Sequence, residues 1–176
     1  MASVFGHTAV ALTGSTLFSK GVLTRSVIIT GVLLSIMPDI DVLSFRFGIP
    51  YTHWLGHRGI THSIFFAAIF SGLIALLFRK KAGRSKGVLW LYFFLCLGSH
   101  GVLDAMTSGG RGVGFFIPFS LERHFLPFRP ILVSPIEIED FFGSWGLRVI
   151  QSETVWILLP CLLIVAGVWV VRRVRA

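Results

Sequence analysis

The chain has 176 residues, of which 54% are hydrophobic and only 14% are charged. This composition excludes an ordinary soluble domain and favours a single membrane domain over residues 1–176. The net charge of +8 is better explained by membrane topology than by binding to nucleic acid, so no nucleic-acid partner is expected.

Five apolar segments predict an all-α fold, a polytopic membrane helix bundle of about five helices, two of them short. The short segments, 5–18 and 27–37, would cross a bilayer only where it thins or where neighbouring helices cover them. Segments 64–78 and 154–171 are stronger candidates. The second contains no charged residue, and its length of about 27 Å approaches the thickness of a hydrocarbon core.

The remaining apolar segment, 87–106, is equally long but contains His100 and Asp104 near its end. Ionisable residues at such depth are costly unless they face a partner or a cavity, so they indicate a functional site. The two cysteines, Cys96 and Cys161, lie inside apolar runs and are expected to pack there rather than form a disulfide.

Basic residues indicate the orientation, because short cytoplasmic loops retain Lys and Arg. Three segments contain basic residues without any acidic residue: Lys20, Arg25, Arg79, Lys80, Lys81, Arg84, Lys86, Arg172, Arg173 and Arg175. With five helices, these segments predict a cytoplasmic C-terminus and an N-terminus on the outer side. All acidic residues and histidines then fall on or near the outer side, although neither was used to orient the chain.

Residues 105–152 are predicted to form an aromatic- and proline-rich cap at the level of the lipid headgroups. Within the cap, Ser134, Pro135 and Glu137 fit a capping box and predict a short helix over 135–142. The glycine-rich run 108–114 is either an anion-binding nest or a simple turn.

Clusters of histidine and aspartate lie at the outer ends of four predicted helices. They are His7 in the first helix, Asp39 and Asp41 after the second, His57 and His62 before the third, and His100 and Asp104 in the fourth. The last two are four residues apart and therefore share a helical face. His57 and His62 are five apart, so both can reach one site only if 58–60 forms a turn, which Gly59 permits.

Imidazoles and carboxylates together suit zinc or another borderline divalent ion, and more than four such ligands allow one or two ions. Metal-activated water would then hydrolyse a phosphoester. The general base would be whichever of Asp39 and Asp41 the metal leaves free, and Arg58 or Arg123 would steady the phosphate. A covalent acyl mechanism has little support, because the chain has no Gly-x-Ser-x-Gly motif.

Simpler interpretations stay open for several residues. His7 could be a satisfied histidine at a helix end, and the Asp39/Asp41 pair could cap the following segment. Glu153 is either a helix-start carboxylate or a further ligand. Four arginines either clamp phosphate or pair with Glu122, Glu137 or Glu139: Arg58, Arg111, Arg123 and Arg129. Two histidines are assigned to surface loops and excluded from the site: His53 and His124.

These motifs, in their order and spacing, resemble the YdjM/YbcI-type family of bacterial inner-membrane, metal-dependent hydrolases. The resemblance covers nearly the whole chain and is carried by His7, 37–41, 56–63, 99–104, 107–114, 122–123 and 152–156. It implies a multi-pass protein of the bacterial inner membrane. With the orientation above, the N-terminus and the site would be periplasmic.

The family is in turn distantly similar to the zinc-dependent phospholipase C and single-strand nuclease superfamily. Residues 5–9 resemble the N-terminal Gly-His segment of those enzymes, and His100-x-x-x-Asp104 matches their His-x-x-x-Asp motif. The similarity implies five ligands: His7, one of Asp39 and Asp41, one of His57 and His62, His100, and Asp104. A later histidine and a His-x-x-x-Glu motif of those enzymes are absent here, which favours one or two ions over three.

The sequence therefore predicts a membrane-bound, metal-dependent hydrolase of a phosphoester, with a membrane lipid or another amphiphilic phosphoester as substrate. The alternative is a non-catalytic, metal-binding structural membrane protein, in which the same cluster pins helix ends together. A metal transporter is disfavoured, because transport needs ligands near the midplane and on both sides, and no histidine or acidic residue lies near the inner face.

Overall fold

The computed structural model describes residues 1–18, 23–78 and 86–175, and within these ranges it contains helices and no strand. The α-helices are α1 (Val4–Thr16), α2 (Arg25–Ile36), α3 (Ile64–Leu77), α5 (Lys86–Ala105), α6 (Ile138–Phe141), α7 (Ser144–Glu153) and α8 (Leu159–Val174). Two 3₁₀ helices, η1 (Met37–Phe47) and η2 (Ile60–His62), and a π-helical turn, η3 (Thr154–Leu158), complete the set. The predicted all-helical bundle is confirmed.

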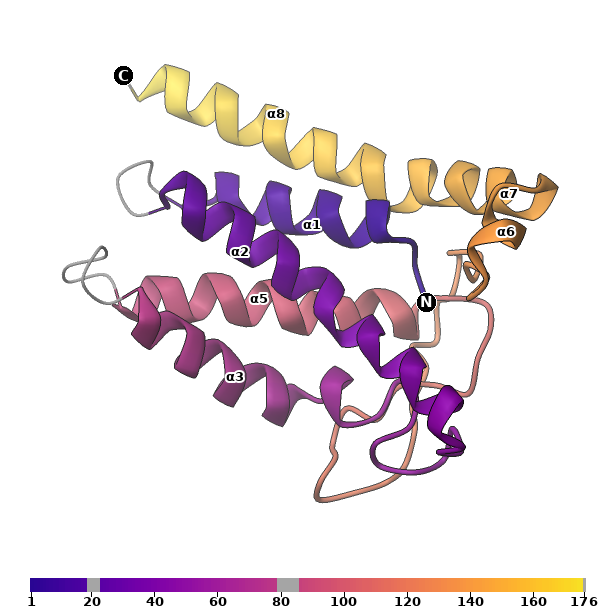
Figure 1. Cartoon of the computed structure of the whole chain (residues 1–176). Coiled ribbons are helices and arrows are strands. Elements are labelled where there is room, and N and C mark those ends of the chain that lie inside the picture. The colour runs from indigo at the N-terminus through magenta and orange to yellow at the C-terminus, as the bar shows by residue number, and fades with distance from the viewer. Residues whose placement is uncertain (19–22, 79–85, 176) are drawn as a thin grey trace.

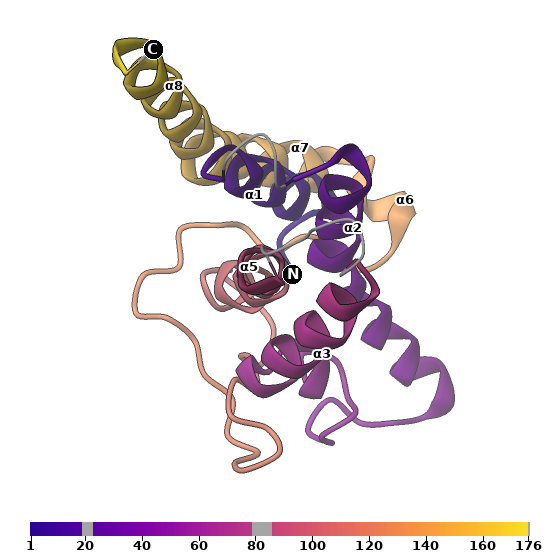
Figure 2. The ribbon, with the colours of Figure 1, turned by 90° about the vertical axis from the view of Figure 1, so that its left-hand side faces the viewer.

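Helix α5 lies at the centre of the bundle and packs against α1, α2 and α3 (Figures 1 and 2). Its buried face includes Leu89, Tyr92 and Phe93. Gly31 of α2 lies directly against Tyr92, since a Cβ at Gly31 would be 2.5 Å from the tyrosine hydroxyl. The missing side chain at Gly31 therefore sets how closely α2 approaches α5. Cys96 and Cys161 are buried and free, as predicted.

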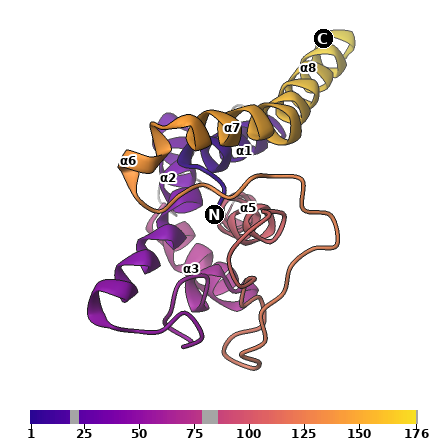
Figure 3. The ribbon, with the colours of Figure 1, turned by 90° about the vertical axis from the view of Figure 1, so that its right-hand side faces the viewer.

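The helices alternate in direction, so their ends form two groups (Figure 1). One group contains the C-terminal ends of α1, α3 and α8 and the starts of α2 and α5, with the basic residues Arg25, Lys86, Arg172, Arg173 and Arg175. The other basic residues of the predicted cytoplasmic segments lie outside the described residues: Lys20, Arg79, Lys80, Lys81 and Arg84. The opposite end of the bundle carries the N-terminus, η1, the end of α5 and the cap (Figure 3).

Three helical stretches are long and apolar enough to cross a membrane: Arg25–Phe47, Lys86–Ala105 and Ser144–Val174. Predicted segments 64–78 and 87–106 match α3 and α5 to within one residue. Segments 27–37 and 154–171 were predicted too short, because α2 continues into η1 and α8 is preceded by α7 and η3. Polar residues interrupt the apolar pattern in both extensions, whereas the helical backbone continues through them.

The cap follows α5 as an irregular chain with two isolated bridges, which pair Thr107 with Ile131 and Val113 with His124. The predicted helix over 135–142 is wrong in its start, because α6 begins at Ile138 and lacks a side-chain cap. Ser134 does not cap this helix. Its backbone N–H donates to the Met1 carbonyl at 2.9 Å, which ties the chain before α6 to the N-terminus.

Candidate metal centre

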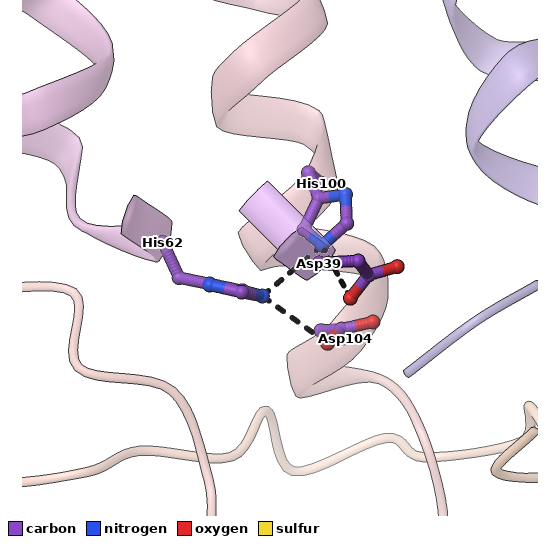
Figure 4. Close-up of side chains that lie close together, drawn as sticks. All are labelled: Asp39, His62, His100 and Asp104. Carbon is purple, nitrogen blue, oxygen red and sulfur yellow. Dashed lines mark hydrogen bonds and ion pairs between the residues drawn. The ribbon is translucent and has the colours of Figure 1, made fainter. Parts of the chain in front are cut away.

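Four side chains from separate parts of the sequence meet at the capped end of the bundle (Figure 4). Asp39 comes from η1, His62 from η2, and His100 and Asp104 from one face of α5. Each offers one ligand atom, and these four atoms lie within 4.8 Å of one another. All four residues are buried. The fold therefore gathers two imidazoles and two carboxylates in one enclosed position.

The spacing of the four ligand atoms resembles that of a coordination shell. Nε2 of His62 lies 3.0 Å from Nε2 of His100, which is 3.3 Å from Oδ1 of Asp39. Nε2 of His62 lies 3.6 Å from Oδ2 of Asp104. Two nitrogens bound tetrahedrally to one zinc ion are about 3.3 Å apart. The two imidazole nitrogens, 3.0 Å apart, are close to this separation, and the two carboxylate oxygens lie near enough to be further ligands.

The hydrogen bonding of the carboxylates tests whether a cation fits. Within the described chain, neither oxygen of Asp39 has a hydrogen-bond donor, whereas Oδ2 of Asp104 forms an ion pair with Nε of Arg58 at 2.9 Å. Burial of a carboxylate oxygen without a partner is costly. A divalent cation beside Asp39 would satisfy its two oxygens and offset its negative charge. The four residues therefore fit a divalent metal ion with two nitrogen and two oxygen ligands.

Each of the two cluster imidazoles, His62 and His100, is held by an oxygen atom on the side of the ring away from the other ligands. Nδ1 of His100 lies 2.7 Å from the Ser35 carbonyl oxygen, which can only accept, so Nδ1 carries the proton and the Nε2 lone pair faces the cluster. Nδ1 of His62 lies 3.1 Å from Oδ2 of Asp41, so this carboxylate holds Nδ1 and leaves Nε2 as the nitrogen that faces the cluster. Carbonyl and carboxylate partners of this kind are typical of metal-binding histidines.

The Asp41 contacts also control the charge of His62. Burial alone lowers the pKa of His62, but its contacts with Asp104 and Asp41, and the charges of both, outweigh burial and raise the pKa from 6.5 to about 9. In the absence of a metal ion, His62 therefore carries a proton at neutral pH. A metal ion would have to displace this proton.

Asp41 and His57 lie behind the cluster rather than in it. Oδ1 of Asp41 is 2.6 Å from Nδ1 of His57, and Oδ2 accepts from the Arg58 N–H at 2.9 Å and from the Thr61 hydroxyl at 2.7 Å. Both oxygens of Asp41 are thus engaged by the turn that holds His62. The structure does not bring the predicted ligands Asp41 and His57 into the four-residue group.

His7 lies beside the cluster. Its ring stacks on His100, with centroids 3.8 Å apart and an interplanar angle of 12°. Nε2 of His7 is 3.6 Å from Oδ1 of Asp104, and neither ring nitrogen has a hydrogen-bond partner in the described structure. His7 therefore borders the candidate site through Asp104.

Arg58 supports Asp104 from within the protein. It is 1% exposed, and its φ of 59° forms the predicted turn between His57 and His62. Nε lies 2.9 Å from Oδ2 of Asp104, and the two terminal nitrogens donate to the Gly109 carbonyl and the Thr107 hydroxyl. All three nitrogens of the guanidinium thus contact oxygen atoms of the protein, and the 108–114 run supplies one of these, the Gly109 carbonyl.

Arg123 holds the same turn from outside. It donates to the carbonyls of His57, Arg58 and His53 at 2.9, 2.8 and 3.1 Å, and its guanidinium carbon lies 4.8 Å from the centroid of the Tyr51 ring. Among the described ion pairs, neither Arg58 nor Arg123 is matched with an acidic residue of the cap.

Glu153 lies near the N-terminus of α1 rather than in the cluster. Its two oxygens accept from the backbone N–H and the hydroxyl of Ser3, each at 2.5 Å. Ser3 is the N-cap of α1, so Glu153 fixes the helix that carries His7. The two histidines excluded at the sequence level also lie outside the four-residue group: His53 and His124.

Comparison with known proteins identifies the family. The family model described as YdjM inner membrane protein matches residues 1–175. The chain belongs to the YdjM family. Inner membrane protein YbcI of Escherichia coli is 38% identical over 175 residues, which are 98% of this chain and 100% of that protein. No solved structure matches the chain significantly.

Membership of the YdjM family confirms that the chain is an inner-membrane protein. The family and relative names give a location and no reaction, so the chemistry depends on the site. Several site residues had no signal in the sequence. The Ser35 carbonyl is a backbone group 65 residues from His100, and the Thr107 hydroxyl contacts the site by accepting from Arg58 and donating to the backbone carbonyl of Asp104.

Proposed function

We propose that this YdjM-family protein is a membrane-bound, metal-dependent hydrolase that acts on a phosphoester such as a lipid headgroup. One observation carries the proposal: two imidazole nitrogens and two carboxylate oxygens lie within 4.8 Å of one another in a chain of the inner membrane. The position at one end of the helices suits a headgroup whose acyl chains stay in the bilayer. The alternative class of substrate is another amphiphilic phosphoester.

The mixed nitrogen and oxygen ligands favour zinc. A bound divalent ion supplies a Lewis acid that activates water and neutralises phosphoryl oxygens. His62 and His100 would hold it through Nε2, and Asp39 and Asp104 through one oxygen each. These residues account for one ion. A second ion would need His7, whose ring nitrogens lack hydrogen-bond partners within the described chain.

The surrounding residues would prepare the site for this chemistry. The oxygen of Asp39 that does not bind the ion would accept the proton of the attacking water. Asp41 and the Ser35 carbonyl would keep both imidazoles aimed at the ion. Because the terminal nitrogens of Arg58 and Arg123 donate to groups within the protein, we expect both arginines to hold the site together rather than clamp the phosphate.

We propose further that the candidate centre faces the periplasm and that the C-terminus is cytoplasmic. The described basic residues of the predicted inner segments gather at the end of the bundle opposite the centre (Figure 1), which supports this orientation. A phosphatase reporter that is active only in the periplasm, fused to the C-terminus, should be inactive, and a cytoplasm-active reporter should be active. The reverse pattern would overturn the orientation.

Hydrolysis is tested with protein purified in detergent, loaded with zinc and given phospholipids, isoprenoid phosphates and a generic phosphodiester. We expect turnover of at least one phosphoester, its loss in His100→Ala, and its retention in His53→Ala, which removes an exposed histidine outside the cluster. Equal turnover in wild type and His100→Ala would show that the activity does not come from the candidate metal centre.

A structural metal site is the second candidate, and burial favours it. All four cluster residues are buried, and the guanidinium of Arg58 packs against Asp104. In that case the ion would pin η1, η2 and α5 together. Purified protein that holds stoichiometric metal but hydrolyses none of the tested phosphoesters, and that loses much of its thermal stability when the metal is chelated, would support a structural metal site.

A further inference from the structure

An apolar groove lies between α1, α5 and the stretch formed by η3 and α8. Its volume is about 320 Å³, and its lining includes Val10, Gly14, Leu95, Leu103, Trp156 and Ile164. Helix α8 packs against α1 and η3 and has no extensive contact with α5. Figure 2 shows α8 leaning away from the rest of the bundle. The groove therefore opens sideways between helices α5 and α8.

Small residues and an irregular helix create this groove. A Cβ at Gly14 would meet no atom within 4 Å, so that position faces open space. On the other wall, the π-helical turn η3 and Pro160 come directly before the departing part of α8. Both π-turns and prolines deflect helices. The opening is thus a consequence of the backbone at Gly14 and at η3.

One end of the groove lies beside the candidate metal centre. Ser99 and Leu103, which line the groove, directly precede His100 and Asp104 on α5. On α1, the lining begins at Val10, about one turn after His7. From this end the groove extends along α8 to Ile164. It therefore leads from the candidate metal centre into the apolar part of the bundle.

We propose that this groove binds one acyl chain of a membrane lipid, with the polar end of that lipid beside the candidate metal centre. A groove that opens sideways from an inner-membrane bundle meets hydrocarbon chains, and a void there forfeits dispersion contacts that a chain would restore. The volume suits part of a small molecule.

The proposal that the groove binds an acyl chain depends only on the residues that line it. The identification of the bound lipid with the substrate rests on the proposed hydrolase function. That step assigns the substrate class to lipids with a flexible acyl chain, rather than to small water-soluble phosphoesters.

The test uses full-length protein in vesicles of phosphatidylethanolamine and phosphatidylglycerol, with a trace of phosphatidylglycerol that carries a photoactivatable diazirine in one acyl chain. Mass spectrometry after illumination should find adducts concentrated on Val10, Leu95 and Ile164. Gly14→Leu fills the groove and should lower these adducts about fivefold, since its side chain replaces several dispersion contacts. Gly98→Leu is the matched control, because Gly98 also has no atom within 4 Å of its Cβ and does not line the groove.

Unchanged labelling in Gly14→Leu, or labelling spread evenly to exposed positions of α3 such as Leu73 and Leu76, would overturn the proposal. Crosslinks through the groove to a second copy would also overturn it. The two proposals fail separately. Labelling at the groove without hydrolysis would contradict the proposed hydrolase function and leave the lipid-binding groove supported. Lipid hydrolysis that Gly14→Leu does not affect would contradict the role of the groove in substrate binding and leave the hydrolase function supported.

Discussion

At the scale of single residues, Asp41 connects most of the parts that support the candidate centre. Its two oxygens contact His57, His62, the Arg58 N–H and the Thr61 hydroxyl. Asp39, two residues earlier, has no hydrogen-bond donor for either oxygen within the described chain. Two neighbouring aspartates thus have separate tasks: Asp39 offers free electron pairs to a cation, and Asp41 orients an imidazole.

This division predicts different effects of two matched substitutions. Asp41→Asn should weaken metal affinity by about 10–100-fold, the usual cost of losing a partner of a metal-binding histidine. Asp39→Asn should weaken affinity further, because it removes a ligand. Metal titration of the purified variants measures both, with the exposed Asp140→Asn as control. A larger loss in Asp41→Asn than in Asp39→Asn would reverse the assignment.

The raised pKa of His62 predicts how the metal-free protein responds to pH. Burial lowers this pKa, but contacts with Asp104 and Asp41 raise it from 6.5 to about 9. A group whose pKa is higher in the folded than in the unfolded protein stabilises the fold fully at pH values below its unfolded-state pKa. This stabilisation is lost as the pH rises through the folded-state pKa. When a chelator keeps the protein metal-free, the melting temperature should therefore fall as the pH rises from 6.5 to 9. The fall should correspond to a loss of a few kcal/mol of folding free energy.

The metal-loaded protein should lack this fall, because the ion takes the place of the proton. His62→Gln in chelator should also show a flatter profile, which isolates His62 from other groups that titrate in the same range. A melting temperature of the metal-free wild type that stays level or rises over this range would contradict the charge assigned to His62.

All four cluster residues were among the ligands predicted from the sequence, but their separation from the supporting residues could not be predicted. The patterns at 37–41, 56–63 and 100–104 lead to Asp39, His62, His100 and Asp104. The separation of Asp39 from Asp41 depends on how the 3₁₀ helix η1 turns these two side chains. The roles of Arg58 and Arg123 depend on backbone carbonyls and a hydroxyl, which leave no pattern in the sequence.

At the scale of helices, the site depends on close contact between α2 and α5. Gly31 allows α2 to lie against Tyr92 of α5, and four residues later the Ser35 carbonyl holds His100. The same pair of helices thus supplies the packing and the orientation of a candidate ligand. A change in their separation should affect both.

Gly31→Ala tests this coupling. Its Cβ would lie 2.5 Å from the Tyr92 ring, and forced overpacking typically costs about 1–3 kcal/mol of folding free energy. We expect a lower melting temperature together with weaker metal binding. Gly87→Ala, at a helical position with no atom within 4 Å of the new Cβ, should lower neither the melting temperature nor metal binding. Normal metal binding in a destabilised Gly31→Ala protein would show that the helix contact and the site are independent.

Apolar patterning predicted which helices exist better than where they end. Helices α3 and α5 were found to within one residue because their apolar runs coincide with the helices. Helices η1 and α7 were missed because helical backbone continues through polar residues such as Asp39, Asp41 and Arg148. Tertiary contact also overrode a local signal at Ser134, whose backbone pairs with Met1 instead of starting a helix.

At the scale of the whole molecule, the fold brings together parts of the chain that are far apart. Residues from η1, η2 and α5 form the four-residue cluster, and the N-terminus reaches it, since the Ala2 N–H donates to Asp104 at 2.8 Å. The family and the membrane class were predicted from the sequence and are confirmed. The distant similarity to zinc-dependent phospholipase C and the hydrolase activity stay predictions.

Metal analysis of purified protein shows whether Asp39, His62, His100 and Asp104 bind a divalent cation. We expect about one zinc or similar ion for each chain after zinc loading and desalting, its loss in His100→Ala, and its retention in His53→Ala. Wild-type protein that stays metal-free after loading, or His100→Ala protein that keeps a full complement of metal, would rule out a metal site formed by these four residues.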